Sequence, residues 1–244
     1  MAIRFGRNSA SMPLSEHFKE LRSRLLRIFL VVSVGVVVGF VLYPQLLTLL
    51  QHPYCKVSPK HCNFLVTNPL EGLSVRIKVS IYFSFLMSLP AIFWHSWRFI
   101  TPGLKKRERS YALSFVAASV VFFFLGATTA YLSFSAAITW LQNVGGQQLT
   151  TYYSPSQYIN LFLLMLVAFG LTFEFPVALV ALQLADLVTP RGLLRQWRYA
   201  IISITIGAAL ITPSGDPLSM FALGLPLVLF YFLAIGVGRL LGKK

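Results

Sequence analysis

Acidic residues are scarce in this chain. Only seven of its 244 residues are Asp or Glu, against 21 Lys and Arg, and charged residues make up 11% of the total. Hydrophobic residues make up 56%, and the mean hydropathy is +0.71. A soluble globular protein of this composition would leave too much apolar surface in water, so that class is excluded. We predict an all-α polytopic membrane protein that forms one domain over residues 1–244.

Histidine and cysteine, which often carry catalysis or bind metals, are also scarce. The chain has four histidines and two cysteines. The histidines lie in loops or at predicted membrane interfaces: His17, His52, His61 and His95. None belongs to a serine-protease or metalloprotease arrangement inside the membrane. We therefore expect no enzymatic activity and no cofactor.

Long apolar stretches dominate the sequence. Six are candidate membrane spans: residues 25–43, 75–93, 111–141, 159–184, 199–212 and 218–238. The first begins too late and runs too long for a cleaved signal peptide, so we expect it to be retained. The fifth rises only about 21 Å at 1.5 Å per residue. It must therefore thin the bilayer or rest against partner helices.

Basic residues predict the orientation of these spans. Because consecutive spans cross the membrane in opposite directions, four of the connecting and terminal segments lie on the same side. Seventeen of the 21 Lys and Arg fall in these four segments: residues 4–27, 98–109, 191–198 and 239–244. Positive charge favours the cytoplasmic side, so both termini are expected there. A nucleic-acid-binding function does not fit, because the charges are divided among short segments with no nucleic-acid module between them.

The segment 44–74 is predicted to form a cap on the outer surface. It contains four prolines, which we expect to divide it into short amphipathic turns: Pro44, Pro53, Pro59 and Pro69. Its Cys55 and Cys62 are the only cysteines. On an oxidising side of the membrane a disulfide is the first interpretation, and free thiols are the second. A metal site with His52 and His61 is third, because the spacing matches no common zinc pattern.

One carboxylate, Glu174, falls inside the apolar run 161–182. An acid at mid-membrane depth costs at least ~2.5 kcal/mol, so such a residue is buried against protein or used in function. It could serve as a proton site in a small-solute carrier. It could also be a purely structural hydrogen-bonding group between helices.

Further acids lie in the basic segments at the predicted cytoplasmic edge. Glu16 and Glu20 precede the first span, and Glu108 lies within the run KKRER. Local ion pairs such as Glu20 with Arg24 are one explanation, worth a few tenths of a kcal/mol. The alternative is a receptor for guanidinium groups, whose planar fork suits bidentate contacts with carboxylates.

Four motifs make the second explanation specific. The segment 14–25, LSEHFKELRSRL, resembles the E-H-L-x-E-L-R-x-R-L signature of the TatC family, the multispanning receptor of the twin-arginine protein translocase. The segments FITPGLKKRER (99–109), FGLTFEFP (169–176) and TPSGDP (212–217) resemble its first cytoplasmic loop, its fourth-span motif and its last outer turn. The resemblance covers about residues 12–241. Four ordered motifs together are far more specific than any one alone.

The resemblance implies six transmembrane helices in a concave, glove-like bundle. It implies a receptor that recognises twin-arginine signal peptides and supports export of folded proteins driven by the proton-motive force. Glu20 and Glu108 fall where the family binds the arginines, and Glu174 falls on its intramembrane glutamate. The remaining residues of the cytoplasmic motifs would support that site: Glu16, Leu21, Arg22, Arg24, Pro102 and Arg109. Arg22 would support the first motif or meet a lipid phosphate.

The resemblance also implies partners and a location. Single-span subunits of the TatA and TatB type would dock around the fifth span of an oligomeric complex, with Thr212 and Met220 as candidate contacts. The membrane would be a bacterial inner membrane or a thylakoid, with both termini on the cytoplasmic or stromal side. The alternative function is a proton-coupled small-solute transporter that uses Glu174. Spans one to three and four to six share no obvious repeat, which such carriers commonly have.

Overall fold

The computed structural model describes residues 14–59, 62–66, 68–100, 112–146 and 153–240. Every regular element in these ranges is a helix, which confirms the all-α prediction. The helices are α1 (Leu14–Val41), α2 (Tyr43–Val57), α3 (Glu71–Ile100), α4 (Ala112–Gly145), α5 (Pro155–Thr172), α6 (Phe175–Leu184), α7 (Pro190–Arg195), α8 (Trp197–Ile211) and α9 (Pro217–Leu240).

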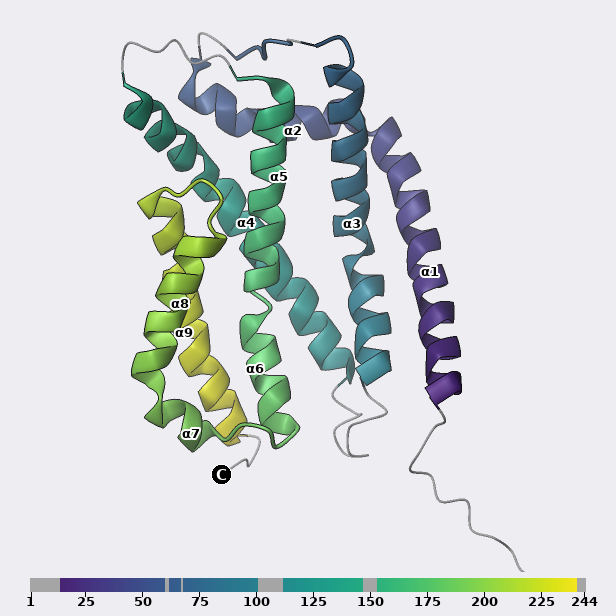
Figure 1. The fold of residues 1–244 in the computed structure, drawn as a ribbon, viewed down its shortest axis with the longest axis vertical. Coiled ribbons are helices and arrows are strands. Elements are labelled where there is room, and N and C mark those ends of the chain that lie inside the picture. The colour runs from purple at the N-terminus through teal and green to yellow at the C-terminus, as the bar shows by residue number, and fades with distance from the viewer. Residues whose placement is uncertain (1–13, 60–61, 67, 101–111, 147–152, 241–244) are drawn as a thin grey trace, which may run out of the picture.

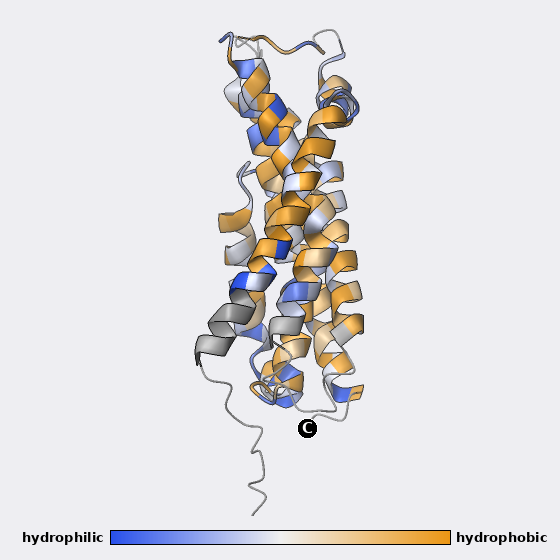
Figure 2. Ribbon diagram, turned by 90° about the vertical axis from the view of Figure 1, so that its right-hand side faces the viewer, coloured by the Kyte–Doolittle hydropathy of each residue, from blue (hydrophilic) through white to orange (hydrophobic). Residues whose placement is uncertain are grey.

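The long helices have the length and composition of membrane spans. Within the described residues, five helical segments are long and apolar enough to cross a bilayer: Arg22–Val41, Glu71–Trp97, Leu113–Gly145, Pro155–Leu184 and Pro217–Leu240. The remaining predicted stretch, the fifth (199–212), corresponds to α8, which is apolar but has only 15 residues. Figure 2 shows hydrophobic residues along most of the bundle and hydrophilic residues gathered toward its two ends. The protein is therefore a multi-pass integral membrane protein.

The helices are arranged as a row with two different edges (Figure 1). Along most of its length α1 packs on α3 alone, and α3 in turn packs on α4 and α5. On the other side, α6 and α4 pack on α9. Helix α8 packs on α9 in turn and forms the edge of the row opposite α1. The first turn of α1 and the last turn of α9 lie at one end of the bundle, together with α7. We call this the terminal end, and α2 crosses the opposite end.

The structure differs from the sequence prediction in the cap. Residues 43–57 form one 15-residue helix, α2, and not a set of short turns. Pro44 lies in the first turn, where no backbone donor is required. Pro53 lies inside the helix, but it is buried in the last turns, so packing outweighs the lost hydrogen bond. The expectation of successive turns was therefore wrong for this half of the segment.

Aromatic side chains attach the cap to the helices beneath it. The Tyr54 ring of α2 is fully buried and packs on Phe64, Tyr153 and Tyr158 with ring centroids 5.2 to 5.6 Å apart. The Tyr158 hydroxyl donates to the carbonyl of Leu50 at 2.9 Å. Such aromatic pairs contribute about 0.5–1.5 kcal/mol each beyond the burial of their area. The cap is therefore a packed part of the fold.

A disulfide closes the loop after α2. It joins Cys55 to Cys62, with Cα atoms 4.8 Å apart. Beside it the Gln51 amide donates to the carbonyl of Cys62 at 2.6 Å. Because both sulfurs are bonded to each other, neither is a thiolate for the metal site considered from the sequence.

The seam between α1 and α3 is built from small residues and two arginines. A Cβ atom added at Gly35 would lie 2.5 Å from the Ser84 hydroxyl, so the two helices are in close contact there. At one end Arg76 of α3 donates to the Phe40 carbonyl in the last turn of α1, at 2.9 Å. At the other, the buried Arg24 of α1 donates to the His95 carbonyl near the end of α3, at 3.5 Å. Both cations satisfy carbonyls near a helix C-terminus.

Candidate functional site

The fourth span is broken next to its glutamate. The structure separates it into α5 and α6 at residues 173–174. Pro176 causes the break, because it has no N–H group and its ring would clash with the carbonyl of Thr172 in a continuous helix. The Thr172 hydroxyl bonds back to the Ala168 carbonyl at 2.6 Å, and the Glu174 amide bonds to the Leu171 carbonyl at 3.1 Å. The break therefore leaves Glu174 at the start of α6.

Two glycines bring α4 against this break. A Cβ atom added at Gly126 of α4 would lie 2.6 Å from the carbonyl oxygen of Phe169, so the helix touches the α5 backbone. On the opposing helix, a Cβ atom at Gly170 would lie 2.6 Å from the ring of Phe123. At both positions, any side chain larger than the hydrogen of glycine would force the neighbouring atoms to move. This close crossing fixes the height of Glu174 relative to α4.

Glu174 lies in the resulting interface between helices. Its buried Oε1 atom has no hydrogen-bond partner in the described part of the chain. Ser119 of α4, which is 2% exposed, hydrogen-bonds to the carboxyl. Glu174 lies about 15 Å from the end of α6 at 1.5 Å per residue, which is half of a ~30 Å hydrocarbon layer. The carboxyl therefore lies inside the apolar segment Pro155–Leu184, with one oxygen available to accept a hydrogen bond.

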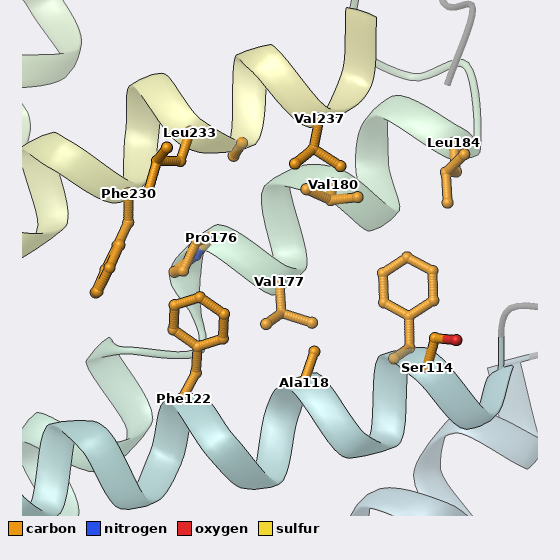
Figure 3. A pocket seen from close by; sticks show the side chains of 12 residues that line it. Ser114, Ala118, Phe122, Pro176, Val177, Val180, Leu184, Phe230, Leu233 and Val237 are labelled. Atoms are coloured by element: carbon orange, nitrogen blue, oxygen red, sulfur yellow. The ribbon is translucent and has the colours of Figure 1, made fainter. Parts of the chain in front are cut away.

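An apolar pocket runs along α6 from Pro176, two residues after Glu174, to Leu184 (Figure 3). Its volume is about 290 Å³, and its walls come from α4, α6 and α9. Near Glu174 the rings of Phe122 and Phe230 meet edge to face, with centroids 5.0 Å apart. Pro176 lies in the same wall, and Leu184 lies at the far end. This pocket, which we call the α4/α6/α9 pocket, is lined almost entirely by carbon.

The structure describes only part of the two motifs that the sequence predicts at the cytoplasmic edge. Glu108, Pro102 and Arg109 lie outside the described residues. The backbone of Glu16, Glu20 and Leu21 belongs to the first turns of α1, but their side chains lie outside the described part. Arg22 is exposed, whereas Arg24 is 8% exposed and reaches α3. The role of Arg24 visible in the structure is to join two helices.

The turn between α8 and α9 is compact. Gly215 adopts φ +61, a conformation that glycine reaches without strain. The Asp216 carboxylate accepts hydrogen bonds from the Ser214 hydroxyl and from the Ser219 amide, and so caps α9. Thr212 is buried and donates to the Ala208 carbonyl at 2.7 Å. Its hydroxyl is therefore already used within α8, while Met220 is half-buried against the core.

Two polar residues were not identified from the sequence. Ser119 gave no signal, because a serine in an apolar helix is ordinary. Gln183 did give one, as an amide inside the apolar stretch 159–184. It is fully buried, and its Nε2 atom donates to the Ala234 carbonyl of α9 at 3.1 Å. Gly238 provides the space, because a Cβ atom there would collide with the amide oxygen.

Comparison with known proteins identifies the family. The family model described as Sec-independent protein translocase protein (TatC) matches residues 16–226. The chain belongs to the TatC family. It is 37% identical over 245 residues to the TatC protein of Frankia casuarinae, covering 96% of this chain and 67% of that protein. It is 33% identical over 236 residues to TatC of Aquifex aeolicus, covering 96% and 97%.

The fold agrees with that assignment. A crystal structure of the twin-arginine translocase receptor TatC matches with a TM-score of 0.75 at 31% identity, covering 91% of this chain and 99% of that one. A second TatC crystal structure matches with a TM-score of 0.74. TatC-family membership implies a non-enzymatic translocase component that works in a complex with other Tat subunits. It favours the protein-translocation hypothesis over the small-solute carrier.

Proposed function

We propose that this chain is the receptor subunit of a twin-arginine translocase, which binds twin-arginine signal peptides and supports export of folded proteins driven by the proton-motive force. Membership in the TatC family and the similarity to the TatC receptor structures support the proposal. The observation that carries it is the pairing of α1 with α3, because this pairing brings together the helix ends that flank both cytoplasmic motifs.

The pairing constrains two sequence-remote motifs. Glu20 is four residues before Arg24, and Arg24 contacts α3 at the His95 carbonyl. The α3 helix ends at Ile100, and α4 begins at Ala112, so Glu108 belongs to a short connection between two helix ends. All these ends lie at the terminal end of the bundle (Figure 1). In our proposal, Glu20 and Glu108 share the two guanidinium groups there, through bidentate charged hydrogen bonds.

The proposed orientation places the terminal end on the cytoplasmic or stromal side, because most of the basic residues flank that end in the sequence. The membrane would be a bacterial inner membrane or a thylakoid. The cap of α2 would then face the outside, where its disulfide is chemically favoured.

Glu174 would act at a later stage than signal binding. Its unpartnered Oε1 atom at mid-membrane depth can accept a hydrogen bond from an entering polypeptide or subunit. Subunits of the TatA and TatB type would dock along α8, a short apolar helix at the edge of the bundle with many exposed residues. Thr212, at the end of α8, and Met220, in the first turn of α9, remain candidate contacts.

Peptide binding tests the proposal directly. The affinity of the purified protein is measured for a signal peptide with two arginines and for the same peptide with two lysines. Lysine keeps the charge but lacks the planar fork, so the wild-type protein is expected to prefer arginine. Glu20→Gln and Glu108→Gln should each weaken arginine-peptide binding about tenfold to a hundredfold, corresponding to about 1.5–3 kcal/mol for a charged hydrogen bond.

Glu174→Gln is the matched control, because it removes one carboxylate far from the terminal end. It should bind the arginine peptide as the wild type does. Equal affinity of the wild-type protein for the two peptides would show that guanidinium recognition is absent and would contradict the proposed function.

A further inference from the structure

We propose that the break in the fourth span is a hinge, about which α6, α7 and α9 move together toward α4. The hydrogen bond between Ser119 and Glu174 holds this hinge in the position that the structure shows. The motion belongs to the free protein and can be measured without a signal peptide, whereas its consequence for transport rests on the proposed function.

The half of the span before the break is fixed to α3 and α4. Helix α5 packs on both. A Cβ atom added at Gly126 of α4 or at Gly170 of α5 would lie 2.6 Å from the nearest atom of the other helix, so the two backbones are in close contact. Helix α1 joins them through α3. Helices α1, α3, α4 and α5 therefore form one closely packed unit.

The half of the span after the break belongs to a second unit. Helix α6 packs mainly on α9. Near the end of α6 the fully buried Gln183 amide donates to the Ala234 carbonyl of α9 at 3.1 Å. The Tyr231 hydroxyl of α9 donates to the Leu193 carbonyl of α7 at 2.7 Å. Breaking either bond would leave a polar group unsatisfied, so these three helices move as one body.

A short joint connects the two units within the fourth span. It consists of Phe173 and Glu174, and the nearby Pro176 cannot donate the backbone hydrogen bond of a continuous helix. The Phe230 ring of α9 meets the rings of Phe122 and Phe173 edge to face, with centroids 5.0 and 5.5 Å apart. Because these ring contacts lie at the level of the joint, they change little when the far end of α6 moves.

Beyond the joint, the α4/α6/α9 pocket separates α4 from the second unit. Figure 3 shows Phe122 and Ala118 of α4 pointing toward Val177 of α6 across this space. The ten residues of α6 form a lever about 15 Å long at 1.5 Å per residue. A rigid-body rotation of about 15° would move its far end by about 4 Å. The pocket therefore gives the second unit room to move toward α4.

A hydrogen bond joins the two units at the hinge. Ser119 of α4 is 2% exposed and bonds to the carboxyl of Glu174, the residue that precedes α6. Within an apolar layer neither group can exchange this bond for one with bulk water, so the bond favours the hinge position in which it forms. Ser119 is thus a positioning residue, which sets the direction of the unpartnered Oε1 atom of Glu174.

Distances between pairs of nitroxide labels test the motion in the full protein in phosphatidylcholine nanodiscs. The crossing pair, L113C/V237C, uses exposed residues of α4 and α9 on the two sides of the pocket. A maleimide label leaves the Cys55–Cys62 disulfide unmodified. Pulsed electron paramagnetic resonance should give two distance populations about 4 Å apart for the crossing pair.

Two control pairs lie within one unit each and also use exposed residues. They should each give a single narrow population, because the helices that carry them move together. One pair joins α4 to α5 and the other joins α6 to α9: V121C/L164C and L182C/L233C.

Substitutions test the joint and its hydrogen bond. Ser119→Ala should shift the ratio of the two populations about tenfold toward the shorter distance, the effect of losing one hydrogen bond to a carboxyl group. Ser133→Ala is the matched control, because this buried α4 serine bonds to the Ala130 carbonyl of its own helix at 3.2 Å. It should leave the ratio unchanged. Pro176→Ala restores the backbone donor and should merge the two populations into one.

Three results would overturn the hinge. A single population for the crossing pair, as narrow as in the controls, would show that the units do not move. Equally broad distributions for all three pairs would place the motion elsewhere. An unchanged ratio in Ser119→Ala would remove the role of its hydrogen bond. None of these measurements uses a peptide, so a failed hinge leaves the receptor function standing, and failed arginine recognition leaves the hinge standing.

The consequence for transport has its own test. Cross-linking L113C/V237C with a short rigid bismaleimide should reduce transport of a folded passenger at least tenfold and leave arginine-peptide affinity unchanged. Cross-linked V121C/L164C is the control and should transport normally. Equal transport by the two cross-linked proteins would show that translocation does not use the hinge.

Discussion

The close crossing of α4 and α5 gives a prediction in which two opposing effects can be separated. Replacing glycine by alanine inside a helix stabilises it by up to about 1 kcal/mol through backbone propensity. At Gly126 the added methyl group would lie 2.6 Å from the Phe169 carbonyl oxygen and 2.9 Å from the Phe173 ring. Because the nearest of these atoms belongs to backbone, α4 must move away. Overpacking of this kind costs about 1–3 kcal/mol.

Gly236 provides the matched control. It lies inside α9, and a Cβ atom there would have nothing within 4 Å. Gly236→Ala should therefore show only the gain in propensity, whereas Gly126→Ala should be about 1–3 kcal/mol less stable than that control. Gly170→Ala should fall between them, since its added methyl group meets only the side chain of Phe123, which can shift.

The assay is reversible unfolding of the purified protein in mixed micelles of mild detergent and dodecyl sulfate, followed by circular dichroism. The three alanine variants should rank with position 236 the most stable and position 126 the least stable. If Gly126→Ala were as stable as Gly236→Ala, the tight backbone contact beside Glu174 would be refuted.

Three further predictions concern the cap, the seam and the membrane carboxyl. Reducing the disulfide, or replacing Cys55 and Cys62 by serine, should lower the free energy of unfolding by about 2 kcal/mol, as expected for so short a loop. Unfolding measured under matched oxidising and reducing conditions checks this prediction. An equal free energy of unfolding under the two conditions would contradict it. Arg24→Gln should lower the free energy of unfolding by about 1 kcal/mol through loss of its hydrogen bond to α3, and it should weaken peptide binding. Arg27→Gln, at an exposed position, is the control. Equal stability and equal peptide affinity of the two variants would count against a role for Arg24 in joining α1 to α3. Glu174→Gln should leave folding and peptide binding unchanged but reduce transport of a folded passenger in inverted membrane vesicles, whereas undiminished flux would favour a purely structural carboxyl.

The main features of the fold could be predicted from the sequence. Apolar stretches of about 20 residues can only be helices in a bilayer, because every backbone polar group must be satisfied within its own segment. The all-α class followed directly from that requirement. Four ordered motifs, each recognisable over a few residues, indicated the TatC family that the comparisons established.

The cap was harder to predict, because proline has a context-dependent effect. Pro44 and Pro53 argue against helix when only their neighbours in sequence are considered. In the structure Pro44 begins α2, and Pro53 is buried beside Tyr54. The packing of Tyr54 against the rings of Tyr153 and Tyr158 stabilises the helix, and these rings are about 100 residues away in the sequence.

The sequence by itself determined the membrane class, the positions of the spans and the presence of one carboxylate within the apolar run 161–182, because all three depend on residue type along a continuous segment. Only the tertiary structure decided what that carboxylate contacts. Ser119 comes next to Glu174 through the crossing of α4 with the break between α5 and α6, where Gly126 and Gly170 let the helices touch. The α4/α6/α9 pocket likewise has walls from three separate helices. Such sites depend on distances between residues that are remote along the chain, and residue order alone does not fix those distances.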